Sequence, residues 1–506
     1  MNSPGRFSGR FAGHPQLLPD PDTAAAAVRQ LREHLRRRPD DGPAWLALAQ
    51  LLAGGLPGPE LHHALEQAIQ SNPESTDAWL LAAGVHRRQR GLDAALHWLA
   101  HWSRQNPDLT APQVAAAALQ AEAARQAGRW QDAVTFYREV EKSRPLDPAL
   151  LNDIGSCLAS LERFDDATAY FRAALQQRPR FPEAQLNLGL LLACQGRDDA
   201  ALQHIAEVLE DDGIAADTRH GAQVLQAILR EHGRLRRPLE RAVRTGRVDD
   251  LQAALESTPA LLAQPHADTV SRLRRVAERC RELTPAAIGG PLGTADDANP
   301  DAARRVEAAI LCNLEGGAGQ LQELDARLAA AAGAEPAEAT EHRFRCVLRA
   351  IRDRDRHDCG QLCGAEGEAW LRYWHARLLA TEPDKRPGQY KLSANAIKGL
   401  PLTPPEQVAG SLGLALRELS PTVPAGAARG LFLYVAVNMI HAFGDGNGRL
   451  ARFLLAWETA RTGARRLLVP VAARAPVAQA LDVAWLEGEV APLAAAISQA
   501  TDRPLR

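Results

Sequence analysis

Five prolines recur at nearly even spacing along the first half of the chain, and their period restricts the folds that this half can adopt. They are Pro39, Pro73, Pro107, Pro145 and Pro179, separated by 34, 34, 38 and 34 residues. Each follows a segment of helical character, as in LEQAIQSNP and FRAALQQRP. A period of this length predicts a series of similar helical units stacked along the chain, in place of one central core.

Small and aromatic residues also hold fixed places in these units. Trp45 and Trp79 lie six residues after the first two prolines, and Gly155 and Gly189 lie ten residues after the last two. The pattern resembles that of tetratricopeptide (TPR) repeats, in which helical hairpins stack because no hairpin buries its apolar face alone. The resemblance implies about five units, with the tryptophans in the core and a groove that docks a partner protein. A spacer or a dimerisation arm is the alternative.

A second feature, the stretch HAFGDGNGRLAR from His441 to Arg452, predicts a loop that binds anions. The segment before it, GLFLYVAVNMI from Gly430, is apolar and predicts a buried helix, and Leu450–Thr462 predicts another helix. The glycine-rich run between them is therefore a tight loop that leads into a helix N-terminus. Backbone N–H groups and the helix dipole favour an anion at such a place.

The side chains of this stretch suit phosphate chemistry. His441 has an ordinary pKa near neutrality and can take a proton from an incoming hydroxyl. Asp445 is a hard oxygen ligand, which suits Mg²⁺. Arg449 and Arg452 are three residues apart, so we expect them on one helix face, where their planar forks can hold phosphate oxygens. Together these residues favour transfer from a nucleoside triphosphate to an alcohol.

The same stretch resembles the signature of the Fic family, H-x-F-x-D/E-G-N-G-R-x-x-R. The matching residues are His441, Phe443, Asp445, Gly446, Asn447, Gly448, Arg449 and Arg452, and Ala442 stands where proline is usual. The resemblance implies a helical Fic fold and transfer of AMP from ATP to a Ser, Thr or Tyr hydroxyl of a protein. The alternative is a glycine-rich turn between helices with incidental charges.

The resemblance also implies a role for each matching residue. His441 is the base, Asp445 holds Mg²⁺, and Phe443 anchors the loop in the core. The run Gly446, Asn447 and Gly448 binds the α-phosphate region, and Arg449 and Arg452 hold the outer phosphates.

A glutamate further upstream resembles part of a known inhibitory motif. The segment from Ala302 to Glu315 predicts a helix that ends at two glycines. Many Fic proteins carry an inhibitory helix of the form S/T-x-x-x-E-G/N, and Glu315 with Gly316 resembles its core, although Leu311 occupies the hydroxyl position. The resemblance implies that Glu315 pairs with Arg452 and blocks productive seating of ATP. A plain surface glutamate is the alternative.

The segment from Lys385 to Ile397 predicts the single β-hairpin of this half. A turn at Lys385–Gly388 precedes residues that tend to alternate in polarity. It resembles the Fic flap, which clamps a target segment by strand addition, and Lys391 replaces the usual arginine. The resemblance implies that Tyr390, Lys391, Leu392 and Ser393 contact the target protein. A simple surface hairpin is the alternative.

These features predict an all-α chain with one small hairpin. We expect a flexible N-terminus over 1–22, a TPR array over 23–215, a helical extension and linker over 216–298, and a Fic domain over 299–506. The net charge of −2 and a pI of about 6.7 argue against nucleic-acid binding through bulk positive charge. The seven scattered cysteines favour reduced thiols. Neither a secretory signal nor a membrane segment is apparent, which favours a bacterial cytoplasmic protein. A secreted effector and a homodimer are left open.

The expected function is therefore a protein adenylyltransferase that uses ATP and Mg²⁺ and docks its client through the TPR groove and the flap. Three alternatives remain. The same site could remove AMP, an activity that depends on the inhibitory glutamate in a similar protein. It could transfer another nucleotide or a phosphate group. The chain could also be a TPR adaptor with an inactive Fic domain, in which case no histidine-dependent labelling of any protein would occur.

Overall fold

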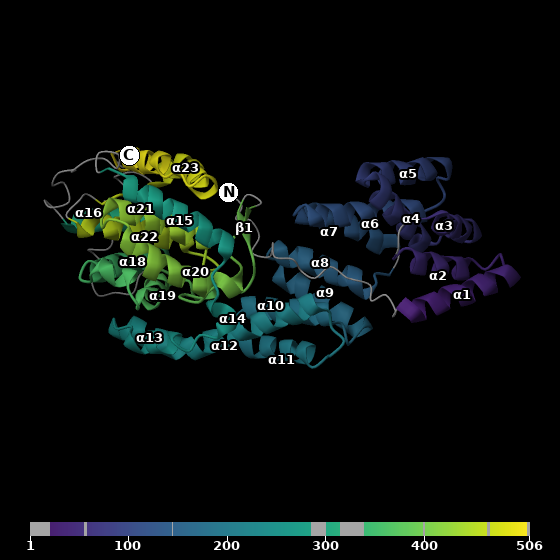
Figure 1. The fold of residues 1–506 in the computed structure, drawn as a ribbon, viewed down its shortest axis with the longest axis horizontal. Coiled ribbons are helices and arrows are strands. Elements are labelled where there is room, and N and C mark those ends of the chain that lie inside the picture. The colour runs from purple at the N-terminus through teal and green to yellow at the C-terminus, as the bar shows by residue number, and fades with distance from the viewer. Residues whose placement is uncertain are drawn as a thin grey trace. The chain divides into compact units, whose positions relative to one another are not determined.

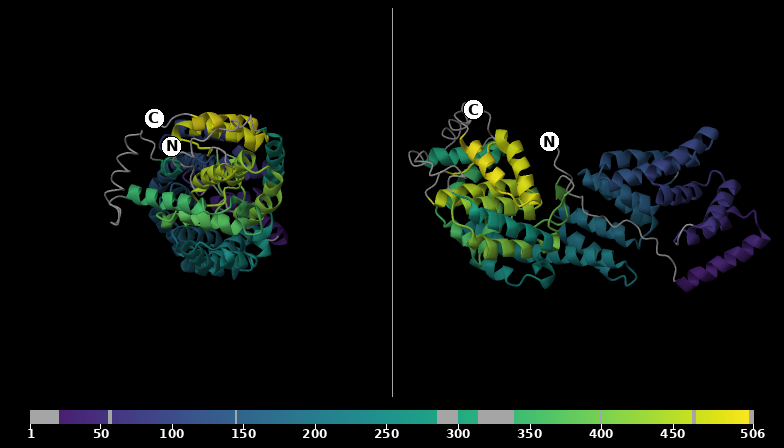
Figure 2. Two further views of the ribbon diagram at one scale, coloured as in Figure 1. Left: turned by 90° about the vertical axis from the view of Figure 1, so that its left-hand side faces the viewer. Right: turned by 45° about the horizontal axis from the view of Figure 1, so that its top comes forward.

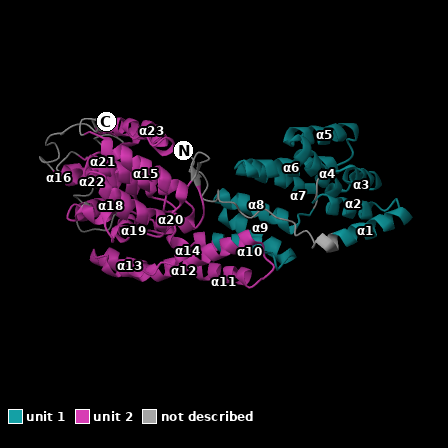
Figure 3. Ribbon diagram, viewed as in Figure 1, with its two compact units in different colours: residues 1, 3, 5–191 teal, residues 2, 4, 192–506 magenta. Residues whose placement is uncertain are grey.

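The computed structural model describes residues 21–54, 58–143, 145–284, 300–313, 339–397, 400–462 and 466–502. The chain divides into two compact units, with the boundary between Leu191 and Leu192 (Figure 3). Both units are built from helices, which confirms the predicted all-α class (Figure 1). The boundary falls inside the predicted TPR array, and the domain limits at 22, 215 and 298 stay predictions.

The first unit is a succession of helical hairpins. Its helices are α1 (Pro21–Arg37), α2 (Gly42–Leu52), α3 (Pro59–Ser71), α4 (Thr76–Arg90), α5 (Leu92–Gln105), α6 (Ala111–Gln126), α7 (Trp130–Ser143), α8 (Pro148–Ser160), α9 (Phe164–Gln177) and the first part of α10 (Pro182–Cys194). Consecutive helices pack against each other, as α6 does with α7 and α8 with α9.

The proline period has a physical basis in this unit. The indole nitrogen of Trp79 donates a hydrogen bond to the Pro73 carbonyl at 2.7 Å, and Trp45 does the same to Pro39 at 2.8 Å. Trp79 is buried and Trp45 is partly buried against the neighbouring core. A Cβ at Gly155 would lie 2.7 Å from the Phe171 ring, so a small residue is required where α8 and α9 cross.

The second unit contains the remaining helices of the described residues. They are α11 (Asp198–Leu209), α12 (Ala216–Thr245), α13 (Asp249–Leu255), α14 (Ala260–Ala263), α15 (Ala267–Glu282), α16 (Pro300–Cys312), α18 (Ala339–Arg354), α19 (Gly367–Leu378), α20 (Val408–Leu414), α21 (Ala427–Ile440), α22 (Asn447–Arg461), α23 (Arg474–Leu486) and α24 (Ala491–Asp502). Short 3₁₀ or π turns cover Cys359–Cys363, Pro383–Lys385, Pro405–Gln407, Ala415–Leu419, Ser420–Thr422 and Val471–Ala473.

Helices α21 and α22 form the centre of this unit. Figures 1 and 2 show them inside a shell of helices, and α15, α16, α19 and α23 pack directly against them. Nearly every side chain of α21 is buried, as its unbroken apolar sequence predicts. Helix α22 begins at Asn447, three residues before the predicted Leu450, so part of the glycine-rich run is already its first turn.

A buried ionic network joins three helices of this core. Arg354 of α18 has no exposed side-chain surface and donates to Glu307 of α16 at 2.9 Å and to the Phe453 carbonyl of α22 at 3.0 Å. Arg466 bonds Glu307 at 3.0 Å and Asp355 at 2.7 Å. Burial would raise the pKa of Asp355, but Arg354 and Arg466 outweigh it and hold the pKa at about 2. Every charge in the network therefore has a partner, as buried ions require.

The predicted hairpin is shorter than expected. Strand β1 (Ala396–Ile397) pairs antiparallel with β2 (Leu400–Pro401), with Ala396 opposite Pro401. The predicted strand began at Tyr390, but Tyr390 forms an isolated bridge with Phe443 instead. The stretch before β1 is thus tied to the signature loop, and its role as a target-binding flap stays a prediction.

Two predicted elements fall partly or wholly outside the described residues. Helix α16 ends at Cys312, followed by Asn313 in a left-handed conformation, while Glu315 lies outside the described residues. The pairing of Glu315 with Arg452 therefore stays a prediction. Most of the predicted linker lies outside them as well. Among the helices of the described residues, none combines the length and the apolar character needed to cross a membrane.

Candidate active site at the start of helix α22

His441 ends helix α21 in a conformation that is unusual for a residue with a side chain. Its φ is +50°, and its N–H still donates to the Val437 carbonyl at 3.0 Å. A left-handed non-glycine residue costs about 1 kcal/mol or more, so the surrounding structure must hold it there. Such conformations concentrate at functional sites.

The imidazole of His441 is kept neutral. Burial is the main cause, with the neighbouring charge of Lys391 as the second, and together they lower the pKa of His441 to about 4. Its Nδ1 is buried, and a backbone hydrogen bond with Asn438 acts in the opposite direction and raises the pKa without outweighing the burial. The ring therefore carries a free lone pair at neutral pH, which a proton acceptor requires.

Gly446 is the turning point between the loop and helix α22. Its φ is +79°, and an added Cβ would lie 2.9 Å from His375 Nε2 and 2.7 Å from Leu379 Cδ1. Both the backbone conformation and the available space therefore demand glycine. The turn directs the first N–H groups of α22 out of the helix end, where they can meet an anion.

Asn447 closes the loop. Its side-chain amide donates to the Phe443 carbonyl at 2.8 Å, and its Oδ1 accepts the Phe443 N–H at 3.0 Å. The resemblance assigns the run from Gly446 to Gly448 to phosphate binding, which stays a prediction, and the structure places the side chain of Asn447 against the protein backbone. Its backbone N–H, at the start of α22, is the group left for a ligand.

His375 of α19 is the residue that the sequence analysis missed. Its ring stacks on Phe443 at 3.7 Å between centroids, and both side chains are fully buried. Nε2 contacts the Asp445 carbonyl at 2.9 Å, and Nδ1 accepts the Gly388 N–H at 2.8 Å. Because a carbonyl can only accept, the ring proton is on Nε2. Burial lowers the pKa of His375 to about 4, so this neutral form persists at pH 7.

Asp445 presents a half-exposed carboxylate beside the helix end. Its Oδ1 accepts the Gly446 N–H at 2.6 Å, and Lys385 Nζ lies 3.3 Å from Oδ2. The described residues contain no cluster of three or more side chains that could hold a metal alone. One carboxylate suits Mg²⁺, because this ion usually keeps several waters and takes further ligands from substrate phosphates.

The two signature arginines contact different parts of the site. Arg449 Nη1 lies 2.6 Å from Glu382 and 3.1 Å from the Leu378 carbonyl, near the end of α19. Arg452 lies over the first turn of α22, where its Nη1 would be 3.4 Å from a Cβ at Gly448. The expected common face therefore stays a prediction, and Arg452 is the arginine that lies nearer the helix N-terminus in these contacts.

The predicted target-binding residues are less exposed than a clamping strand requires. Tyr390 is buried, with its hydroxyl 2.8 Å from Glu368 and its ring 3.5 Å from the Arg372 guanidinium. Lys391 is also buried and donates to Asn395 at 2.7 Å. Burial lowers the pKa of Lys391 to about 7. Leu392 and Ser393 are half-buried.

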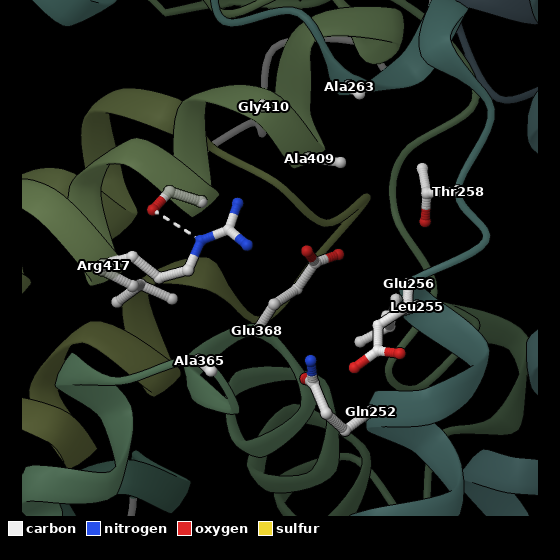
Figure 4. A pocket seen from close by; sticks show the side chains of 12 residues that line it. Gln252, Leu255, Glu256, Thr258, Ala263, Ala365, Glu368, Ala409, Gly410 and Arg417 are labelled. Atoms are coloured by element: carbon white, nitrogen blue, oxygen red, sulfur yellow. Dashed lines mark hydrogen bonds between the residues drawn. The ribbon is translucent and has the colours of Figure 1, made fainter.

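A cavity of about 200 Å³, with a lining of mixed polar and apolar residues, lies beside Glu368. Figure 4 shows the Glu368 carboxylate and the Arg417 guanidinium pointing into it, near Gln252 and Thr258. Arg417 Nε donates to the Gly413 carbonyl at 3.4 Å. No residue of the signature stretch lines this cavity, so it is separate from the candidate active site.

The geometry defines a helical domain in which a neutral histidine and a helix N-terminus share one short loop. A sequence model of the Fic/DOC family matches residues 366–458, and a model of the tetratricopeptide repeat matches residues 62–109, 118–179 and 158–216. The chain therefore contains TPR repeats followed by a Fic/DOC domain.

Solved structures with some similarity include Fic proteins and repeat proteins. Fic-1 (residues 134–508) from C. elegans is 17% identical, with a TM-score of 0.31 over 67% of this chain and 89% of that chain. A thermophilic TPR protein of Thermus thermophilus is 20% identical, with a TM-score of 0.26 over 40% of this chain and 97% of that one. No curated protein matches the chain.

Proposed function

We propose that the chain is a protein adenylyltransferase, which transfers AMP from ATP to a Ser, Thr or Tyr hydroxyl of a partner protein. One observation carries the proposal: His441 and the N-terminus of α22 stand at the two ends of a single loop with an unbroken signature. A base and an anion-binding helix end are thereby held at a fixed short separation along the chain. The TPR repeats suggest interaction with other proteins, so we propose that they dock the client.

His441 performs the proton transfer in this proposal. Since Nδ1 is buried, Nε2 is the nitrogen left to accept the proton of the attacking hydroxyl. The hydroxyl oxygen forms a bond to the α-phosphorus, the bond between the α-phosphorus and the bridging oxygen breaks, and pyrophosphate leaves. His441 is neutral before the reaction, so it enters the step able to take the proton.

The remaining residues hold the triphosphate. The backbone N–H groups of Asn447 and Gly448 donate to phosphate oxygens, the dipole of α22 adds positive potential there, and Arg452 lies beside them. Arg449 supplies a second guanidinium when it leaves its ion pair with Glu382 and binds a phosphate oxygen instead. Mg²⁺, held by Asp445, would neutralise phosphate charge. His375 and Asn447 keep the loop in place through the contacts described above.

We also propose that Glu315 restrains the activity by pairing with Arg452. Replacement of Glu315 by Gly should then raise labelling, because Arg452 becomes available to the outer phosphates. This part of the proposal rests on the resemblance of Glu315 and Gly316 to an inhibitory motif.

Incubation with labelled ATP tests the proposed reaction. The full chain and its Glu315→Gly variant are incubated with lysate and with either α-labelled or γ-labelled ATP, and protein-bound label is measured. We expect incorporation of the α-label alone, its loss in His441→Ala, and its retention in His342→Ala, which removes an exposed histidine of α18.

Other outcomes identify the alternatives. Incorporation of the γ-label would show phosphate transfer, and labelling by α-labelled UTP in preference to ATP would show transfer of a different nucleotide. If no protein is labelled in a histidine-dependent manner, even with Glu315 replaced, the proposed reaction is wrong and the adaptor function remains.

A further inference from the structure

Arg386, in the turn before β1, is bonded to the last repeat hairpin. Its Nη1 and Nη2 donate to the two carboxylate oxygens of Asp198, each at 2.8 Å, and Nη1 also donates to the Ala193 carbonyl at 2.6 Å. Asp198 begins α11, and Ala193 lies near the end of α10. Both residues fall within the last matched TPR repeat, residues 158–216, and within the second compact unit.

The remaining nitrogen of the Arg386 guanidinium is also in use, and Nη2 has a second contact. Nε donates to Gln389 at 2.9 Å, and Nη2 lies 3.1 Å from His232 Nδ1. Burial, followed by the charge of Arg386, keeps the pKa of His232 well below its usual value, so Nδ1 of the neutral ring is able to accept. The guanidinium is mostly buried, at 14% exposure, and the two-oxygen pairing with Asp198 is the strong, directional form of an arginine contact.

The residues after Arg386 hold the signature loop. The N–H of Gly388 donates to His375, whose other ring nitrogen bonds the Asp445 carbonyl. Gly388 itself has a φ of +73° and no room for a Cβ, which would lie 2.9 Å from the Arg372 carbonyl. Three residues further on, the N–H of Lys391 donates to the Ala442 carbonyl at 2.9 Å. A short segment thus contacts the last repeat hairpin at one end and the loop between α21 and α22 at the other.

We propose that the start of α11 and the turn that precedes it, residues 192–198 of the second unit, are part of the active-site structure, with Asp198 and Arg386 as positioning residues for the loop from His441 to Gly446. Asp198 fixes the turn at Arg386, and the turn fixes the loop through Gly388, His375 and Lys391. The catalytic part of this inference rests on the proposed transfer reaction, whereas the structural part does not depend on it.

Hydrogen exchange of the full chain tests the structural part. The variants are Asp198→Asn, Arg386→Gln and the double variant, with Asp199→Asn as the control, since Asp199 is the next residue of the same helix and makes none of these contacts with Arg386. We expect exchange of the backbone amides in 388–391 and 441–446 to become about tenfold faster in both single variants, which corresponds to the loss of a net hydrogen-bond contribution. The control and the amides of α8 and α9 should not change.

The double variant shows whether Asp198 and Arg386 act through their mutual contact or independently of each other. If Asp198 and Arg386 act as one pair, the double variant should exchange no faster than either single variant. Additive acceleration, or unchanged exchange in both loops, would overturn the inference. Arg386→Lys, which keeps the charge but loses the planar fork, serves where a stronger substitution fails to fold, and it should give the same pattern at smaller amplitude.

Activity tests the catalytic part. With α-labelled ATP, we expect kcat to fall about tenfold in Asp198→Asn while KM for ATP stays within about twofold, because Asp198 acts on the position of the base and not on the nucleotide. Faster exchange with unchanged kcat would overturn the positioning role. If the chain is inactive even as the Glu315→Gly variant, the proposed reaction is refuted, and the exchange data still decide the structural part.

Discussion

Glu382 and Arg449 form a close ion pair, with the carboxylate 2.6 Å from Nη1 of the guanidinium and both side chains 15% exposed. Arg343 lies 3.5 Å from the same carboxylate. The first arginine of the signature is therefore neutralised by an acid from the loop after α19. A triphosphate that uses Arg449 must compete with this carboxylate, so Glu382 sets part of the cost of nucleotide binding.

Replacement of Glu382 by Gln should lower KM for ATP about two- to fivefold, because a phosphate oxygen then no longer has to displace a carboxylate from the mostly buried Arg449 guanidinium. Steady-state labelling at varied ATP concentration measures this change. Glu487→Gln, which removes one exposed negative charge at the end of α23, is the control. An unchanged or higher KM would show that Glu382 holds Arg449 in its working position instead.

Gly446 and Gly444 offer a matched pair of substitutions. Gly446→Ala should destabilise the second unit by about 2 kcal/mol or more and abolish labelling, because the left-handed backbone and the contact with His375 leave no space for a methyl group. Gly444→Ala should be tolerated, since nothing lies within 4 Å of its added Cβ and its φ is not positive. Thermal unfolding and labelling of both variants check the prediction. Equal behaviour of the two would contradict it.

The charge of Lys391 should appear in the pH dependence of the reaction. Lys391 lowers the pKa of His441, so Lys391→Met should raise that pKa from about 4 and move the acid limb of kcat/KM to higher pH. Burial is the larger cause and persists, so the limb should stay below 6.5, the ordinary pKa of histidine. Lys391→Arg keeps a charge and should leave the limb at low pH. A pH profile that is identical in wild type and Lys391→Met would exclude this coupling.

The buried neutral His375 should make stability depend on pH. Its folded pKa is about 4, below the ordinary value of 6.5, so between these values the unfolded chain binds the additional proton. The free energy of unfolding should therefore fall as pH decreases from about 6.5, by roughly 3 kcal/mol for this residue, and the effect should level off below about 4. Asp355, whose folded pKa is about 2 and whose ordinary value is 3.8, adds its own loss of stability mainly at the acid end of this window and below it.

Urea unfolding of the second-unit transition at several pH values measures this dependence. His375→Gln cannot gain a proton in this range and should show a flatter profile than the wild type, although its stability at pH 7 will be lower because two loop contacts weaken. An equally steep profile in His375→Gln would assign the pH dependence to other groups, with buried His232 and His441 as the first to examine.

Sequence patterns were sufficient where a feature is local. The apolar run before His441 and the glycines after it predicted the helix–loop–helix around the site, and the proline period predicted the repeat hairpins. Contacts between residues that are far apart in the sequence left no local pattern from which they could be predicted. Asp198 and Arg386 are 188 positions apart, and His375 lies in an ordinary amphipathic helix.

At two places the structure uses side chains in a way that the local pattern did not indicate, and the physical reason is the same. Tyr390 and Lys391 have the alternation of a strand, but hydrogen bonds to Glu368 and Asn395 draw both side chains into the interior. The side chain of Asn447 has the polarity of a ligand-binding group. Its amide instead donates to the Phe443 carbonyl and accepts from the Phe443 N–H. In each case a group of the same chain, which the sequence pattern does not reveal, forms a hydrogen bond with the side chain that the pattern had suggested for a ligand or a target.

The bond between Asp198 and Arg386 also bears on how such chains can be recombined. A chimaera that grafts a foreign repeat array onto this catalytic half has to be joined upstream of Pro182, so that α10 and α11 travel with the enzyme. A join after Leu209 would remove Asp198, whose carboxylate accepts the hydrogen bonds of Arg386. The largely buried guanidinium of Arg386 would then have no counterion. The boundary between the exchangeable repeats and the catalytic half thus lies one helical hairpin earlier in the chain than the repeat pattern alone would place it.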